Sequence, residues 1–202
     1  MNNKTKLLFL ALMLIPIAQL TAQAGISDSF FSFQKNRTEI NETAMLVLGS
    51  WASGNILTGT YGNFKGSGEA KYFHQFNAMW NFVNLGIAAF GYLNSVNSDP
   101  TSMTNLEILS DYSSLQSFLL LNAGLDFAYI ATGFYLKERA KNSTASARLM
   151  GFGNSLLMQG SFLLLFDVSL YFINQSNANI NLFPHLESFL AGGAGVGINL
   201  RL

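Results

Sequence analysis

The stretch GFGNSLLMQGSFLLLFDVSLYFI, from Gly151 to Ile173, decides the fold. A helix needs a run of about 20 mostly apolar residues to cross the hydrocarbon core of a bilayer. This run contains one carboxylate, Asp167, well inside its apolar part. Because a charged group is costly inside a bilayer, Asp167 needs an explanation. The stretch therefore predicts a membrane-spanning helix at about residues 150–173.

The composition of the whole chain is typical of a membrane protein. Of the 202 residues, 50% are hydrophobic and only 11% are charged, against about 25% charged residues in a typical soluble domain. The formal net charge is zero, so no excess of basic residues is available to bind phosphates, and nucleic acid is not an expected partner. The chain has no cysteine, which excludes disulfides and thiolate metal sites.

The first 24 residues are typical of an export signal. Two lysines precede the apolar run 7–17, and Ala22 and Ala24 have the small-x-small spacing of a cleavage site. The apolar run is shorter than a membrane span requires. We expect a signal peptide at residues 1–24, with an uncleaved anchoring helix as the alternative.

The remainder, residues 25–202, is expected to form a single all-α membrane domain, a four-helix transmembrane bundle. Residues 25–42 mix phenylalanines with charged side chains, which suits an amphipathic helix on the membrane surface or an ordered tail on the bundle. The four expected spans are about residues 44–62, 74–95, 115–136 and 150–173. A tail, residues 174–202, follows the last span.

The second expected span has a strongly polar face. Asn77, Asn81 and Asn84 follow one another at steps of four and three residues, so they share one side of a helix. Lipid offers an amide no hydrogen-bond partner, so these side chains must point into protein or water. The first span is rich in glycine, serine and threonine at helical spacing, which favours close contact with a neighbouring helix.

The connections between spans predict the orientation. Lysines and arginines lie in the first and third connections, whereas the second holds Asp99, Glu107 and Asp111 and no basic residue. Basic residues accumulate on the cytoplasmic side, so the first and third connections are expected there. With an export signal and an even number of spans, both mature ends are expected outside, in an inner (cytoplasmic) membrane.

The end of the tail alternates like a strand. Val196, Ile198, Leu200 and Leu202 alternate with glycine or polar residues, which alone is similar to the closing strand of an outer-membrane barrel. The earlier apolar runs are continuous and about twice as long as a barrel strand, so a whole barrel is rejected. We expect a short extended tail at the outer surface.

The chain shows signs of an internal duplication. At an offset of 74 residues, the pattern I-x-T-G-x-Y at residues 56–61 recurs at 130–135, and Gly86 aligns with Gly160. Two duplicated helical hairpins of the same orientation explain this pattern. Chance similarity between two apolar segments is the alternative.

Polar side chains fall at similar depths in all four spans. Counted from the outer end at about 1.5 Å per residue, Asp126 lies about 16 Å deep and Asp167 about 10 Å deep. The other polar side chains fall into layers at these depths or somewhat deeper. The candidate site, a buried polar core, comprises Asn55, Asn81, Asn84, Asn122, Asp126, Gln159 and Asp167.

Two functions are consistent with such a core. The spans contain no lysine or arginine, so Asp126 and Asp167 lack a cationic partner. They can serve as protonatable groups of a small transporter, channel or proton-coupled protein. The leading expectation is instead a structural or accessory membrane protein of unknown activity, in which the polar groups join the helices at about 0.6 kcal/mol per pair.

One structural feature distinguishes the two functions. A transport role needs the acids to line a hydrated cavity, whereas an accessory role needs only neighbouring amides that cap them. Four helices leave little room for a solute path unless the protein oligomerises. The lipid bilayer is an expected partner, and a second copy or a membrane partner protein is a further candidate.

Catalysis is not expected. The nucleophile elbow, zinc-protease and phosphate-loop motifs are absent from the sequence. His74 and His185 are predicted on opposite sides of the bilayer, so neither a metal site nor a cofactor is expected. An intramembrane aspartyl protease needs two acids that share a proton at close range, and the depths of Asp126 and Asp167 differ by about 7 Å.

The residues RLMGFGNSLLMQGSFLLLFD, from Arg148 to Asp167, give the chain a family resemblance. It resembles a group of uncharacterised bacterial membrane proteins that carry a similar Gly-aromatic-Gly, Gln-Gly and Phe-Asp run in their last span. The resemblance extends over the four spans. It implies a four-helix membrane fold and no particular activity.

Overall fold

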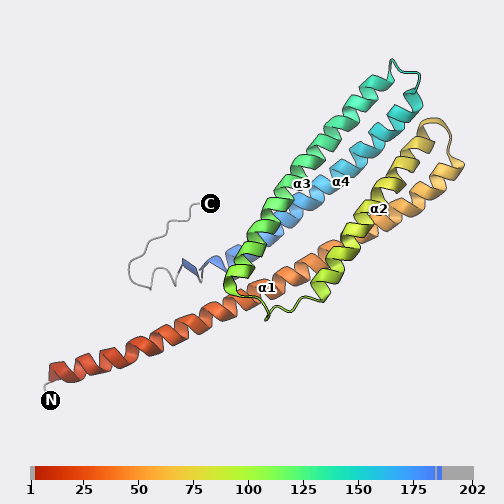
Figure 1. Cartoon of the computed structure of the whole chain (residues 1–202). Helices are drawn as coiled ribbons and strands as arrows, with labels where there is room; N and C mark the ends of the chain where they lie inside the picture. The colour runs from red at the N-terminus through yellow and green to blue at the C-terminus, as the bar shows by residue number, and fades with distance from the viewer. Residues whose placement is uncertain (1–2, 185, 188–202) are drawn as a thin grey trace.

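The computed structural model describes residues 3–184, 186 and 187, with side chains from Asp28 onward. Within this range all four long elements are helices, which confirms the predicted all-α class. They are α1 (Asn3–Lys65), α2 (Gly68–Val96), α3 (Asn105–Ala140) and α4 (Ser146–Asn181). The chain forms two antiparallel hairpins, α1 with α2 and α3 with α4 (Figure 1).

The helices are longer than the predicted spans. α1 continues without a break through residues 25–42, which were expected as a separate surface helix or tail. α4 continues to Asn181, so the first part of the predicted extended tail is helical. The asparagines there are compatible with a helix because their amides bond to the preceding turn, as Asn174 Nδ2 does to the Leu170 carbonyl oxygen at 3.0 Å. The alternating residues 196–202 lie outside the described part.

Glycines permit the tight connection between α1 and α2. Gly68 has a φ of 56°, in the left-handed region that glycine adopts without strain. A Cβ atom on Gly66 would lie 2.6 Å from the Gly62 carbonyl oxygen. At the far end of the molecule, α3 begins with a capping box, in which Thr104 and Glu107 satisfy each other's backbone N–H groups.

The two ends of the bundle differ in charge. The basic end holds the connections at residues 66–67 and 141–145, flanked by lysines and arginines, and the opposite end holds the connection at residues 97–104. Between these ends α4 packs against α2 and, less closely, against α1. No Cα atom of α2 lies within 8 Å of one in α3, so these two helices enclose an open space.

A small apolar core lies at the opposite end, where α1, α3 and α4 extend past α2. Its buried members are Phe30, Phe33, Ile108, Tyr112, Ala178 and Leu182. Beside it, Arg37 is buried and its Nη2 lies 3.4 Å from Asp111 Oδ2. Burial lowers the pKa of the Arg37 guanidinium, and the Asp111 carboxylate partly offsets this effect. Through this core, the part of α1 around Phe30 and Phe33 packs against both helices of the second hairpin.

The bundle is polar inside and apolar outside along most of its length. Asn77, Asn81 and Gln159 are among the largest fully buried side chains. In contrast, Phe90 is 76% exposed and Leu165 is 70% exposed. Among the described residues, α3 and α4 are long and apolar enough to cross a membrane, and only 17% and 28% of their apolar windows are buried. Over the same described residues, α1 and α2 do not meet this criterion.

Matching glycines lie where the helices of each hairpin approach most closely. A Cβ atom on Gly59 of α1 would lie 2.8 Å from the His74 carbonyl oxygen of α2. A Cβ atom on Gly133 of α3 would lie 2.9 Å from the Gly153 carbonyl oxygen of α4. These two glycines are equivalent in the proposed duplication, whereas Gly86 has open space around it and its counterpart Gly160 is crowded.

Candidate functional site

A closed ring of hydrogen bonds joins α1, α2 and α4 in the interior of the bundle. Trp51 Nε1 donates to Gln159 Oε1 at 3.0 Å, and Gln159 Nε2 donates to Asn77 Oδ1. Asn77 Nδ2 donates to Asn55 Oδ1 at 2.9 Å, and Asn55 Nδ2 returns to the Trp51 carbonyl oxygen at 2.8 Å. We call these four residues the amide ring. Each member donates a hydrogen bond to one member and accepts a hydrogen bond from another, so the ring fixes the relative positions of the three helices.

The amide ring continues along α2 toward the opposite end. Asn81 Nδ2 donates to the Asn77 carbonyl oxygen at 2.8 Å, and Asn84 Nδ2 donates to Asn81 Oδ1 at 3.4 Å. The predicted polar face of α2 is therefore confirmed as an interior face. Asn77 was placed on that face but was not among the candidate site residues, although it is the centre of the network. Its spacing from Asn81 and Asn84 is the signal that identifies it.

Asp126 of α3 and Asp167 of α4 form a carboxyl pair. Both side chains are buried, with 3% and 7% exposure, and their carboxyl groups are joined by a hydrogen bond. An ionised carboxylate only accepts hydrogen bonds, so a bond between two carboxyl groups requires a proton on one of them. Oδ2 of Asp126 receives no donor from the described part of the chain. The amides nearby therefore do not cap this pair.

The prediction that these acids are too far apart to share a proton was wrong. A Cβ atom on Gly160 would lie 3.0 Å from the Asp126 carbonyl oxygen, so Gly160 of α4 is level with Asp126. Asp167 is then about 10 Å further along α4. Side chains on a helix lean toward its N-terminus, and α3 and α4 are antiparallel. The two carboxyl groups therefore lean toward each other and meet between the two levels.

A cavity of about 410 Å³ leads to the carboxyl pair from the opposite end of the bundle. It extends from Asn41, Asn94 and Ser95, near the opposite end, to Asp126 and Asp167. Most of its remaining wall is apolar. The cavity lies between the backbones of α2 and α3, whose Cα atoms do not come within 8 Å of each other.

The cavity is closed toward the basic end by aromatic side chains and then by the amide ring. The rings of Trp80 and Tyr129 lie 4.8 Å apart and nearly perpendicular, and both line the cavity. Beyond them, Gln159 and Asn77 are fully buried and do not line it. These side chains therefore bound the cavity on the side of the basic end.

The seven predicted site residues fall into two groups. Asn84, Asn122, Asp126 and Asp167 all line the cavity. Asn55, Asn81 and Gln159 belong to the hydrogen-bond network on its closed side. The predicted layers do not describe this division, because depth along an axis does not say which face of a helix a side chain occupies.

A metal site has no support in the described residues. No group of three or more histidine, aspartate or glutamate side chains there is suited to hold a metal ion. His74 is half-buried near the basic end, and His185 lies outside the described part. The carboxyl pair supplies two ligand side chains, and the cavity around it adds neutral amides.

Comparison with known proteins identifies the family. Residues 47–168 match a family of unknown function, DUF6992, and the chain belongs to this family. The matched segment contains the amide ring and both acids of the carboxyl pair. No curated protein and no solved structure matches the chain.

Proposed function

We propose that the protein is a multi-pass membrane protein whose four helices cross the inner (cytoplasmic) membrane. The inverted distribution of side chains supports this proposal. Amides are fully buried while phenylalanines and leucines cover the outside, and burial of apolar side chains is the usual rule in water. A bilayer accepts the apolar surface, and the amides then hydrogen-bond one another in the interior.

The proposed orientation places the basic end in the cytoplasm and the opposite end outside. Residues 1–24 then act as the export signal, and both mature ends lie outside. Because the natural chain has no cysteine, single substitutions can report this topology. Asp99→Cys and Lys141→Cys change exposed positions at the two ends. A membrane-impermeant maleimide is expected to label intact cells at position 99 only. Equal labelling at both positions before permeabilisation would contradict the orientation.

Within this membrane protein, we propose that the carboxyl pair takes up and releases protons through the cavity. The observation that carries the proposal is that Asp126 and Asp167 line a cavity and that Asp126 Oδ2 is not capped by an amide of the described residues. A group that only joins helices would be satisfied by its neighbours, as the amide ring is. The aromatic side chains and the amide ring bound the cavity on the side of the basic end, which favours a proton-coupled protein in an outward-open state over a continuous channel.

A structural or accessory role is the second candidate. The closed amide ring favours it, because the ring holds three helices together and leaves no path toward the basic end. Under this reading the protein acts with a second copy or a membrane partner protein.

Proton flux in reconstituted vesicles distinguishes the two candidates. With an acidic outside and a potassium ionophore present, the parent protein is expected to acidify the lumen. Asp126→Asn and Asp167→Asn are expected to reduce acidification to the level of empty vesicles. Asp99→Asn, which changes an exposed acid outside the cavity, is the matched control and is expected to behave as the parent. Absence of flux in the parent, or unchanged flux in both cavity variants, would overturn the proton-coupled role.

A further inference from the structure

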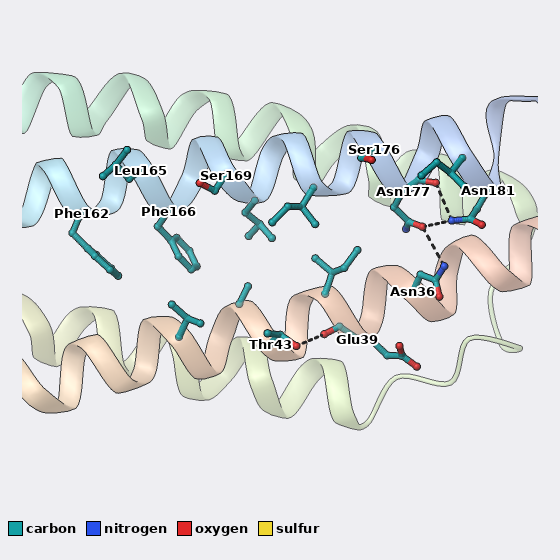
Figure 2. Close-up of a pocket in the computed structure, with 16 residues that line it drawn as sticks. Asn36, Glu39, Thr43, Phe162, Leu165, Phe166, Ser169, Ser176, Asn177 and Asn181 are labelled. Carbon is teal, nitrogen blue, oxygen red and sulfur yellow. Dashed lines mark hydrogen bonds between the residues drawn. The ribbon is translucent and has the colours of Figure 1, made fainter.

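A second hollow in the molecule is separate from the mouth of the cavity that leads to the carboxyl pair. It is a groove of about 910 Å³ along the line where α1 and α4 face each other. Figure 2 shows Phe162, Leu165 and Phe166 of α4 toward one end of the groove. Polar side chains from both helices gather at the other end (Figure 2). The groove thus has an apolar part and a polar part at opposite ends.

The apolar part of the groove has the depth of one membrane leaflet. From Phe162 to Ile173 the helix rises about 17 Å at 1.5 Å per residue, which is about half of a hydrocarbon core of roughly 30 Å. Between these residues the wall is formed by Val47, Leu165 and Leu170. An acyl chain lying along this wall meets almost only carbon atoms.

The polar part of the groove offers hydrogen bonds and one negative charge. Asn36 Nδ2 lies 3.4 Å from Asn177 Oδ1, and Asn181 Nδ2 lies 2.8 Å from the same atom. Ser176 adds a hydroxyl group. Glu39 is the one charged residue in the lining, and its carboxylate forms no ion pair with any described residue. A headgroup with a primary ammonium complements this carboxylate, and the amides and hydroxyl suit its phosphate.

We propose that the groove between α1 and α4 holds one outer-leaflet lipid with a primary-amine headgroup. Its acyl chain lies between Phe162 and Ile173, and its ammonium group lies at Glu39. The inference rests on the proposed membrane insertion and orientation. It does not depend on proton uptake at the carboxyl pair, because the groove is lined by different polar residues.

The test is lipid retention by the full chain. The protein is reconstituted in vesicles of equal phosphatidylethanolamine and phosphatidylglycerol and then purified in mild detergent. Native mass spectrometry is expected to find one phosphatidylethanolamine per chain. Ser169→Trp places an indole in the groove and is expected to abolish retention. The matched control Ser161→Trp changes another exposed serine of α4 that lines neither hollow and is expected to retain the lipid. Glu39→Gln is expected to remove the preference for phosphatidylethanolamine over phosphatidylglycerol.

Several results would overturn the lipid site. They are a parent without retained lipid, equal retention by Ser169→Trp and the parent, and an unchanged preference in Glu39→Gln. A dimer that Ser169→Trp dissociates would assign the groove to a second copy instead. Maleimide labelling of Asp99→Cys and Lys141→Cys is read in intact cells as a parallel experiment. Expected labelling with no retained lipid rejects the lipid site alone, whereas wrong labelling rejects the membrane orientation as well.

Discussion

The carboxyl groups of Asp126 on α3 and Asp167 on α4 meet in a hydrogen bond, although about 10 Å of helix separates their levels on the two backbones. This bond needs one proton, and both acids line the cavity that extends toward the opposite end of the bundle. Two acids on neighbouring helices therefore behave as one site, and a change to either acid changes the partner of the other.

The carboxyl pair makes a prediction about stability that does not depend on transport. Asp167→Leu leaves the buried Asp126 carboxyl group without its partner, and an unsatisfied buried polar group costs about 1–3 kcal/mol. Asp167→Asn keeps a donor for Asp126 and is expected to change the free energy of unfolding by less than about 1 kcal/mol. Thermal unfolding in detergent measures both. Equal losses in the two variants would show that the hydrogen bond does not stabilise the fold.

The amide ring predicts a large effect from a single substitution in α4. Gln159→Leu leaves the Trp51 indole N–H without its acceptor. It also removes one of the two donors to Asn77 Oδ1, which keeps the bond from Asn81 Nδ2 at 3.3 Å. We expect a loss of about 1–3 kcal/mol for the unsatisfied indole N–H, seen as a lower melting temperature. Asn179→Leu removes an exposed amide from the same helix and is the control, with little expected effect. A melting temperature unchanged by Gln159→Leu would refute the role of the ring.

The sequence predicted the helices and the buried polar core better than it predicted the geometry of that core. Apolar content predicted α3 and α4, the helical spacing of small and polar residues supported α1 and α2, and the spacing of Asn81 and Asn84 predicted the interior face of α2. Depth counting could not place Asp126 beside Asp167, because it follows the backbone and ignores the direction in which side chains lean. The space between α2 and α3 depends on how whole helices pack, which no local pattern encodes.

The ends of the helices were predicted less well for a different reason. Span prediction looks for apolar runs, so it stops where polar residues begin. α4 nevertheless continues to Asn181, and α1 is helical through residues 25–42. Tertiary contacts explain both extensions, since Phe33 of α1 and Ala178 and Leu182 of α4 belong to the core at the opposite end. Such contacts between distant segments are not visible in a local hydropathy pattern.

The capping box at the start of α3 makes a prediction about pH. Hydrogen bonds from the backbone N–H and the hydroxyl of Thr104 hold the pKa of Glu107 below its ordinary value of 4.5. A lowered carboxyl pKa contributes stability that is present above the unfolded-state value and is lost as the pH falls through the folded-state value. Carbon NMR of the labelled side chain is expected to give a pKa below 4.5 in the parent. In Thr104→Ala the value is expected to move back toward 4.5, because the hydroxyl bond is lost. The same pKa in both proteins would contradict the capping box.

The close approach of α3 to α4 predicts opposite results for two glycines of the same helix. In Gly133→Ala the new methyl group meets the Gly153 carbonyl oxygen at 2.9 Å, and a backbone atom cannot move aside without shifting the helix. Overpacking of this kind costs about 1–3 kcal/mol. Gly124 has nothing within 4 Å of its Cβ position, so Gly124→Ala is expected to be neutral or to stabilise the helix by up to about 1 kcal/mol.

Gly59→Ala and Gly54→Ala are the corresponding pair in α1, where only Gly59 is crowded by α2. Thermal unfolding of the four variants is expected to separate the crowded pair from the open pair. Equal stability of Gly133→Ala and Gly124→Ala would mean that the hairpin is not held by this glycine contact.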